Sequence, residues 1–142
     1  MTYLDTGCFV KLYYPEPDSA KVVALIQGKP LCYTPLHELE FVNALHLKVF
    51  FGGAVAAQVT AARALVEADL KAGVLVSPGG EWKDILAEAV KLAEQHTGSI
   101  GCRSLDVLHC AAAKVLAASE FVSTDSRQKK LAAAMGLKLV TS

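Results

Sequence analysis

The chain has 142 residues, of which 53% are hydrophobic, and its 14 basic and 14 acidic side chains cancel to no net charge. This length suits one domain, residues 1–142, with a core of its own, and no apolar run is long enough to cross a bilayer. Proteins held on nucleic acid by charge alone are usually strongly basic, so any nucleic-acid contact here must come from local patches. The start, "MTYLDTGC", lacks a secretory signal, which predicts a cytoplasmic protein.

The predicted elements alternate between short strands and helices. In chain order, we expect a strand at 2–5, helices at 6–14 and 18–28, a strand at 31–34, helices at 35–52 and 54–73, a strand at 74–77, helices at 81–99 and 104–119, a strand at 120–124, a helix at 126–136 and a strand at 137–141. This alternation is typical of βαβ units, and it predicts a parallel sheet with helices on both faces.

The four cysteines (Cys8, Cys32, Cys102 and Cys110) are scattered, with no CxxC pair. Their spacing suggests neither a zinc site nor a disulfide framework. We expect each of them to be a small buried hydrophobic side chain.

Two acidic residues follow predicted strands directly. Asp5 closes the first strand and Asp125 closes the fourth. Functional sites of open parallel sheets lie just beyond the carboxyl ends of the strands, which makes both residues candidates. Each can equally be a helix N-cap, because its side chain can accept the free amide hydrogens of the first turn. Asp106, in the first turn of the 104–119 helix, is also explained by the helix dipole alone.

A glutamate pair in the long helix 35–52 is harder to interpret. Glu40 shares a helical row with Leu36, Asn43 and Leu47, whereas Glu38 shares a row with Val42, Leu45 and Val49. Periodicity therefore does not choose between them.

Four stretches together resemble the motif set of PIN-domain ribonucleases, and most closely the VapC toxins of toxin–antitoxin pairs. In chain order, these stretches are "YLDTGCFVKLYYPEP", "ELEFVNAL", "RSLDVLHCAAA" and "FVSTDSRQKKLAAAMGL". The resemblance covers nearly the whole chain. It implies an α/β fold of three layers (α/β/α), with a short central parallel sheet, and it implies a metal-dependent endoribonuclease that leaves a 5′-phosphate and a 3′-hydroxyl.

The resemblance also implies a site. Asp5, Asp106 and Asp125 match the acids that hold the metal ion, and Glu40 matches a further ligand, because "EFVNAL" fits the family motif and the stretch starting at Glu38 does not. Thr6 and Thr124 match polar positions beside these acids. We expect Thr6 to contact substrate and Thr124 to orient a carboxylate or the attacking water.

One departure from the family affects this site. Some members carry another acid shortly after the late one, and here those positions are Ser126, Arg127 and Gln128. The missing acid leaves a second metal position open. It also motivates the rival hypothesis of a non-catalytic PIN-fold module that binds RNA or assembles with other proteins.

The expected chemistry follows from the ligand types. Mg²⁺ or Mn²⁺ takes oxygen ligands, lowers the pKa of bound water and offsets the charge that builds on phosphorus during phosphodiester hydrolysis. Several carboxylates close together are expected to raise one another's pKa when no metal is bound. Two further residues keep two interpretations each. Arg103 contacts an RNA phosphate or pairs with an acid, and His109 contacts substrate or packs between helix and sheet.

The resemblance implies two protein partners, a cognate antitoxin and a second copy of the chain. The stretch "VFFGGAVAAQVTAARALV" is too apolar to be wholly solvated surface in so small a domain. Phe50 and Phe51 are neighbours on a helix and point about 100° apart, so at least one is expected to reach a surface. The alternative is a second internal cluster beneath the helical pair.

Overall fold

The computed structural model describes residues 1–140 and contains a four-stranded sheet. Its strands are β1 (Thr2–Leu4), β2 (Leu31–Cys32), β3 (Leu75–Val76) and β4 (Glu120–Val122). The strand order is β3-β2-β1-β4, and every pairing is parallel. The longest register joins Tyr3 to Phe121 and Leu4 to Val122. The ends of β1 and β4 therefore lie side by side, although 118 residues separate them in the chain.

Helices connect and cover these strands. They are α1 (Thr6–Tyr13), α2 (Ser19–Ile26), α3 (Pro35–Phe50), α4 (Ala56–Lys71), α5 (Trp82–Leu92), the π-helical turn η1 (Ala93–Thr97), α6 (Gly98–Ile100), α7 (Ser104–Val115) and α8 (Ser126–Ala134). Three of these helices begin with a side-chain cap, since the Asp5, Thr34 and Asp125 side chains each accept backbone amide hydrogens at the start of α1, α3 and α8. The caps by Asp5 and Asp125 confirm the prediction from the sequence.

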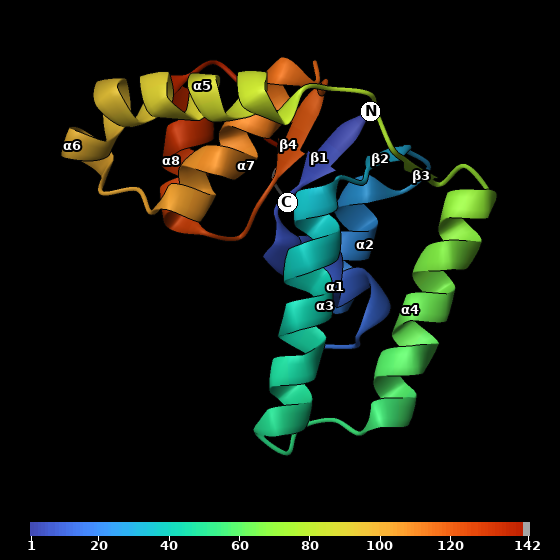
Figure 1. Cartoon of the computed structure of the whole chain (residues 1–142). Coiled ribbons are helices and arrows are strands. Elements are labelled where there is room, and N and C mark those ends of the chain that lie inside the picture. Colours follow the sequence, from blue (N-terminus) through green and yellow to red (C-terminus); the bar gives the residue numbers. More distant parts are fainter. Residues whose placement is uncertain (141–142) are drawn as a thin grey trace.

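The alternation of strand side chains builds one core on each face of the sheet. Leu4, Leu31 and Val122 point to the face covered by α1 to α4. Their neighbours Tyr3 and Phe121 point to the other face, where the buried residues of α5, α7 and α8 pack. Figure 1 shows the sheet between these two groups of helices. The fold is therefore the predicted three-layer α/β/α arrangement.

Two predicted elements differ from the structure in type, and several others end two to four residues before their predicted ends. In place of a full strand at 137–141, there is an isolated parallel bridge between Phe121 and Leu139, held by backbone hydrogen bonds from Phe121 N to Lys138 O and from Val140 N to Phe121 O. Residue 141 lies outside the described residues. The helix predicted at 81–99 changes to a π-helical turn after Leu92 and ends at Ile100, where Gly101 takes a left-handed conformation with φ of 77°.

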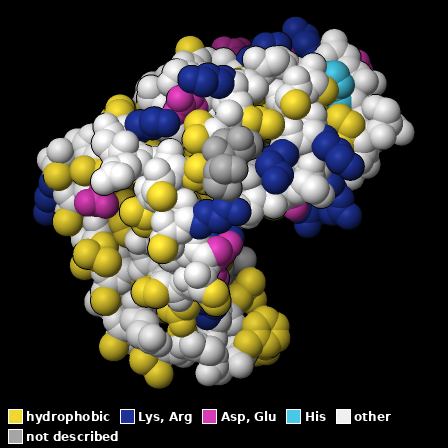
Figure 2. Space-filling view, turned by 180° about the vertical axis from the view of Figure 1, so that it is seen from behind, with side chains coloured by type: hydrophobic (Ala, Val, Ile, Leu, Met, Phe, Trp, Pro, Cys, Tyr) yellow, Lys and Arg dark blue, Asp and Glu magenta, His cyan; other side chains and the backbone are white. Residues whose placement is uncertain are grey.

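Helices α3 and α4 form a long hairpin whose tip is apolar. Phe50 and Phe51 are 79% and 78% exposed, and their rings pack edge to face. Both therefore reach the surface, whereas the buried hairpin residues Leu45, Val59 and Val66 belong to the core on that face of the sheet. Figure 2 shows hydrophobic side chains over this end of the molecule, whereas Lys and Arg gather mostly at the opposite end. None of the helices in residues 1–140 combines the length and the hydrophobicity needed to cross a membrane.

Candidate active site

Three aspartates lie at helix starts around the carboxyl ends of β1 and β4. Asp5 Oδ1 accepts a hydrogen bond from Cys8 N at 2.8 Å, and Asp125 Oδ1 accepts from Arg127 N at 2.9 Å. Asp106 Oδ2 likewise accepts from Arg103 N at 2.9 Å, at the start of α7. A capping role and a role in a site are compatible, because a carboxylate has two oxygens. Capping fixes the side chain and leaves lone pairs for other contacts.

Ser123 connects two of these aspartates, and the sequence analysis did not single it out. Its hydroxyl donates to Asp5 Oδ2 and accepts from Asp125 N at 3.0 Å. Asp5 N also donates to Val122 O at 3.1 Å. Ser123 is buried between β4 and α1, so the turn after β4 is tied to the turn after β1. The only signal in the sequence was a small polar residue directly after an apolar strand.

Glu40 enters the site from α3. Its Oε1 accepts from Thr6 Oγ1 at 2.8 Å and from His109 Nε2 at 2.6 Å. Burial raises the pKa of Glu40, but the hydrogen bonds from His109 and Thr6 outweigh that effect, and the pKa lies below its usual 4.5. Glu38 is exposed on another side of the helix. Thr6, which the sequence predicts to contact substrate, donates its hydroxyl hydrogen to Glu40 and lies in the wall of the pocket.

Arg103 joins the other two acids. Its guanidinium contacts both oxygens of Asp106 at 3.2 Å, and its Nη2 lies 3.2 Å from Asp125 Oδ2. Burial of Asp106 raises its pKa, but the hydrogen bonds from Arg103 lower it by more. The pKa values of Asp106 and Glu40 are thus lowered, and the expectation that neighbouring acids raise them is wrong for both. The reason is that both carboxylates accept hydrogen bonds that favour their charged form, from Arg103 in the case of Asp106 and from His109 and Thr6 in the case of Glu40.

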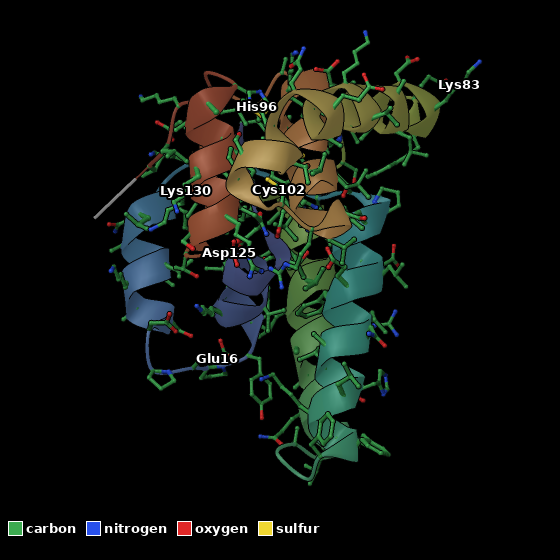
Figure 3. All side chains as sticks on the ribbon, turned by 90° about the vertical axis from the view of Figure 1, so that its left-hand side faces the viewer. Glu16, Lys83, His96, Cys102, Asp125 and Lys130 are labelled. Atoms are coloured by element: carbon green, nitrogen blue, oxygen red, sulfur yellow. The ribbon has the colours of Figure 1, made fainter. Side chains whose placement is uncertain are left out.

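A polar pocket of about 340 Å³ opens between these groups. Its lining includes Thr6, Glu40, Arg103, Asp106, His109 and Gln128. Gln128 lies near the position where some family members carry another acid. It is 8% exposed, and within residues 1–140 its Oε1 has no hydrogen-bond partner. Figure 3 looks towards this end of the sheet, with Asp125 labelled at the start of α8.

An apolar groove continues from the pocket along α3. It has a volume of about 640 Å³ and shares Thr6, Glu40 and Leu105 with the polar pocket. Its remaining walls include Leu36, Leu39, Ala44 and Leu47. Leu39 is 67% exposed and Leu47 is 45% exposed, so the groove presents an apolar surface directly beside the acids.

The predicted site residues are brought together to different degrees. Thr124 is exposed, and its hydroxyl lies 3.5 Å from Lys11 Nζ, with no hydrogen bond to any of the four acids in the part of the chain described. Across residues 1–140, no three His, Cys, Asp or Glu side chains lie close enough together to hold one metal ion. The donor set nevertheless fits Mg²⁺ or Mn²⁺, because Asp5, Glu40, Asp106 and Asp125 offer only oxygen ligands.

Comparisons with known proteins agree with this fold. The profile of the family described as PIN domain matches residues 2–134. The crystal structure of FitAcB from Neisseria gonorrhoeae aligns with a TM-score of 0.61 at 15% identity, covering 99% of this chain and 97% of that chain. At this level of identity, the likeness shows a shared fold. A search of curated protein sequences finds no match.

Proposed function

We infer the function from the fact that this chain belongs to the PIN domain family, whose profile covers all but its first residue and its last eight. PIN domains are generally nucleases. We propose that residues 1–142 form one cytoplasmic domain that acts as an endoribonuclease with Mg²⁺ or Mn²⁺. The observation that carries the proposal is the placement of Asp5, Asp106, Asp125 and Glu40 around the carboxyl ends of β1 and β4.

The four acids would hold the cation and position the water that attacks phosphorus. A bound divalent cation lowers the pKa of its water and stabilises the charge of the transition state. Asp5 and Asp125 are fixed by Ser123 and by the first turns of α1 and α8, so their carboxylates need little reorganisation. Arg103 is 61% exposed and can turn from the acids towards an RNA phosphate, which makes it the substrate-binding residue in this proposal.

The test is cleavage of a labelled RNA in Mn²⁺, in Mg²⁺ and in chelator. We expect cleavage only with metal, and we expect Asp5→Asn to abolish it. A cation that binds only the folded protein also stabilises it, so the melting temperature should be higher with millimolar Mn²⁺ than with chelator. Cleavage that persists in chelator, or equal cleavage by Asp5→Asn, would refute the proposal.

We further propose that the chain is the toxin of a VapBC-type pair. The apolar groove along α3 opens into the acidic pocket, so an antitoxin segment lying there would cover the site. The partner to test is the product of the adjacent reading frame, which we expect to be a short, basic, DNA-binding protein. It should bind and stop cleavage, and Leu39→Glu should weaken binding because Leu39 is 67% exposed in the groove. A neighbour that leaves cleavage unchanged would contradict this proposal.

A homodimer is the second proposed assembly. The exposed Phe50 and Phe51, together with Val55 at 62% exposure, form an apolar hairpin tip, and such a cluster marks an interface. Sedimentation should show a dimer at tens of micromolar. The double variant Phe50→Asp, Phe51→Asp should be a folded monomer. A monomeric wild-type protein would exclude the dimer, and a variant that stays dimeric would move the interface elsewhere.

A second candidate function is a PIN-fold module that binds RNA without cutting it. Two observations favour it. Arg103 pairs with both Asp106 and Asp125, and Gln128 lines the pocket near the position where some relatives have another acid. In this case RNA binding would persist in chelator, and no cleavage would occur with either cation. The cleavage assay above therefore separates the two functions.

A further inference from the structure

A buried histidine links the sheet to the Glu40 carboxylate. His109 lies on α7 and is 2% exposed. Its Nδ1 lies 2.8 Å from the Tyr3 hydroxyl on β1. Its Nε2 lies 2.6 Å from Glu40 Oε1 and 3.2 Å from the Thr6 hydroxyl. The ring also packs against Tyr3, with the two ring centres 5.7 Å apart. Both ring nitrogens therefore have partners, one in the core and one in the pocket.

The partners determine which ring nitrogen carries the proton. An ionised carboxylate only accepts hydrogen bonds, so the contact with Glu40 requires a hydrogen on Nε2. A neutral ring then has a lone pair on Nδ1, which accepts the Tyr3 hydroxyl hydrogen. The Tyr3 hydroxyl is buried, with His109 Nδ1 as its partner at 2.8 Å, and it donates this hydrogen bond. Tyr3 thus selects the tautomer that donates to Glu40.

The same contacts determine how the Glu40 carboxylate is turned. Thr6 and His109 both donate to Oε1. Within residues 1–140, no hydrogen bond is made to Oε2, and the side chain is 22% exposed and lines the polar pocket. One oxygen is therefore tied to the protein, and the other is free for a ligand in the pocket.

We propose that His109 is a positioning residue that, set by Tyr3, fixes the Glu40 carboxylate with one oxygen available to the pocket. The proposal rests on the proposed nuclease function and goes beyond it, because it assigns a role to a residue that does not itself contact RNA. Partners of this kind, which orient metal-binding groups from behind, typically change metal affinity or activity by 10- to 100-fold when they are replaced.

The first test reads the tautomer directly and does not depend on activity. Nitrogen-15 NMR of the histidine rings in the wild-type protein should show His109 with its proton on Nε2. The Glu40→Gln variant should shift that Nε2 resonance, because the charged acceptor is lost. A proton on Nδ1 alone, or a resonance unaffected by Glu40→Gln, would overturn the proposal even if the protein cleaves RNA.

The second test compares two replacements of the same ring. A glutamine amide nitrogen can reach the place of Nε2, whereas an asparagine amide nitrogen reaches only the place of Nδ1. We expect His109→Gln to keep most of the Mn²⁺ affinity and kcat. We expect His109→Asn to lose about 10- to 100-fold in Mn²⁺ affinity or kcat, with little change in KM for RNA.

Calorimetric titration with Mn²⁺ and single-turnover cleavage supply these numbers, and circular dichroism shows that each variant is folded. If both variants are folded and have the Mn²⁺ affinity and kcat of the wild type, the proposal is wrong, and His109 only packs in the core. If the wild-type protein neither binds Mn²⁺ nor cleaves RNA, the proposed function fails, and the NMR result alone decides the positioning role.

Discussion

The two halves of the pocket hold their acids by different physical means. On one side, Glu40 is held by two buried groups, the Thr6 hydroxyl and the His109 ring. On the other side, Asp106 and Asp125 share the guanidinium of Arg103, whose side chain is 61% exposed. The two donors to Glu40 bind one of its oxygens and leave the other open to a cation, whereas the positive guanidinium of Arg103 repels a cation. In the proposed nuclease, the first half would therefore be preorganised for a cation, and the second half would have to open.

This difference separates rigid from movable parts of the site. Exposed ion pairs are weak because water and salt screen them, so Arg103 can leave the aspartates at low cost. Tyr3 and His109 are nearly inaccessible to solvent and pack against one another, and cannot leave without opening the core. Binding of RNA or of a cation would move Arg103 away from Asp106 and Asp125, whereas the Glu40 carboxylate would keep its position.

Removing the charge of Glu40 should have the largest effect. Glu40→Gln keeps the acceptor for Thr6 and His109 but loses the negative charge. We expect single-turnover cleavage to fall more than about 100-fold, since even partners behind the ligands cost 10- to 100-fold. The matched control is Glu38→Gln, an equal change of charge two residues away on the exposed side of α3. If Glu38→Gln lost as much cleavage activity as Glu40→Gln, the total charge of α3 would matter and not the position of Glu40 in the pocket.

The two threonines beside the acids should behave differently. Thr6→Val removes a hydrogen bond to the Glu40 carboxylate. Hydrogen bonds to charged groups contribute about 1.5–3 kcal/mol, so we expect a loss of roughly tenfold or more in kcat. Thr124→Val should change cleavage less than about twofold, because Thr124 is exposed and, within residues 1–140, its hydroxyl has a hydrogen bond only with Lys11, at 3.5 Å. A larger loss in Thr124→Val would restore the role that the sequence motif suggested for it.

Much of the fold was predictable because its signals are local. Strand and helix order followed from apolar runs, proline and glycine positions, and capping side chains such as Asp5 and Asp125. The last strand was overestimated. Its apolar residues satisfy the same pattern as a strand, but among residues 137–140 only Leu139 forms a bridge to the sheet. The π-helical turn after Leu92 was missed because its sequence continues to favour a regular helix.

The site was predictable only in part because its contacts are non-local. Periodicity did not distinguish Glu40 from Glu38, and the family motif chose Glu40. The partner of Glu40 is His109, which lies 69 residues further along the chain. Ser123 and Asp5 meet across 118 residues through strand pairing. The sequence predicts a parallel sheet but not the strand order β3-β2-β1-β4, which brings these residues together.

Removing the Arg103 charge should strengthen metal binding modestly, whereas the changes above weaken cleavage. In Arg103→Gln, the guanidinium no longer occupies the carboxylates of Asp106 and Asp125. We expect Mn²⁺ to bind a few-fold more tightly, because an exposed ion pair competes only weakly. KM for RNA should rise if Arg103 turns to a phosphate. Arg127→Gln, an equal change of charge on the exposed start of α8, is the control. Weaker Mn²⁺ binding in Arg103→Gln than in this control would contradict the picture of a movable half.

The smallest predicted effect is on the pH dependence of stability without metal. The pKa of Glu40 lies below its ordinary value of 4.5, and that of Asp106 below 3.8. A lowered pKa in the folded state means that the unfolded chain takes up protons first on acidification. The stability from these groups is fully present above about pH 5 and is lost as the pH falls through the two folded pKa values.

Urea unfolding of the metal-free protein at pH 7, 5, 4 and 3 measures this dependence. Glu40→Gln should flatten the decrease between pH 5 and 3, because glutamine does not titrate, and Glu38→Gln should leave the wild-type slope unchanged. Arg103→Gln should flatten it less than Glu40→Gln does, since an exposed cation is screened and the backbone amide of residue 103 still donates to Asp106. If Arg103→Gln flattened the pH dependence of the unfolding free energy more than Glu40→Gln does, Arg103 would hold its aspartates more strongly than His109 and Thr6 hold Glu40. The comparison between the two halves of the pocket would then be reversed.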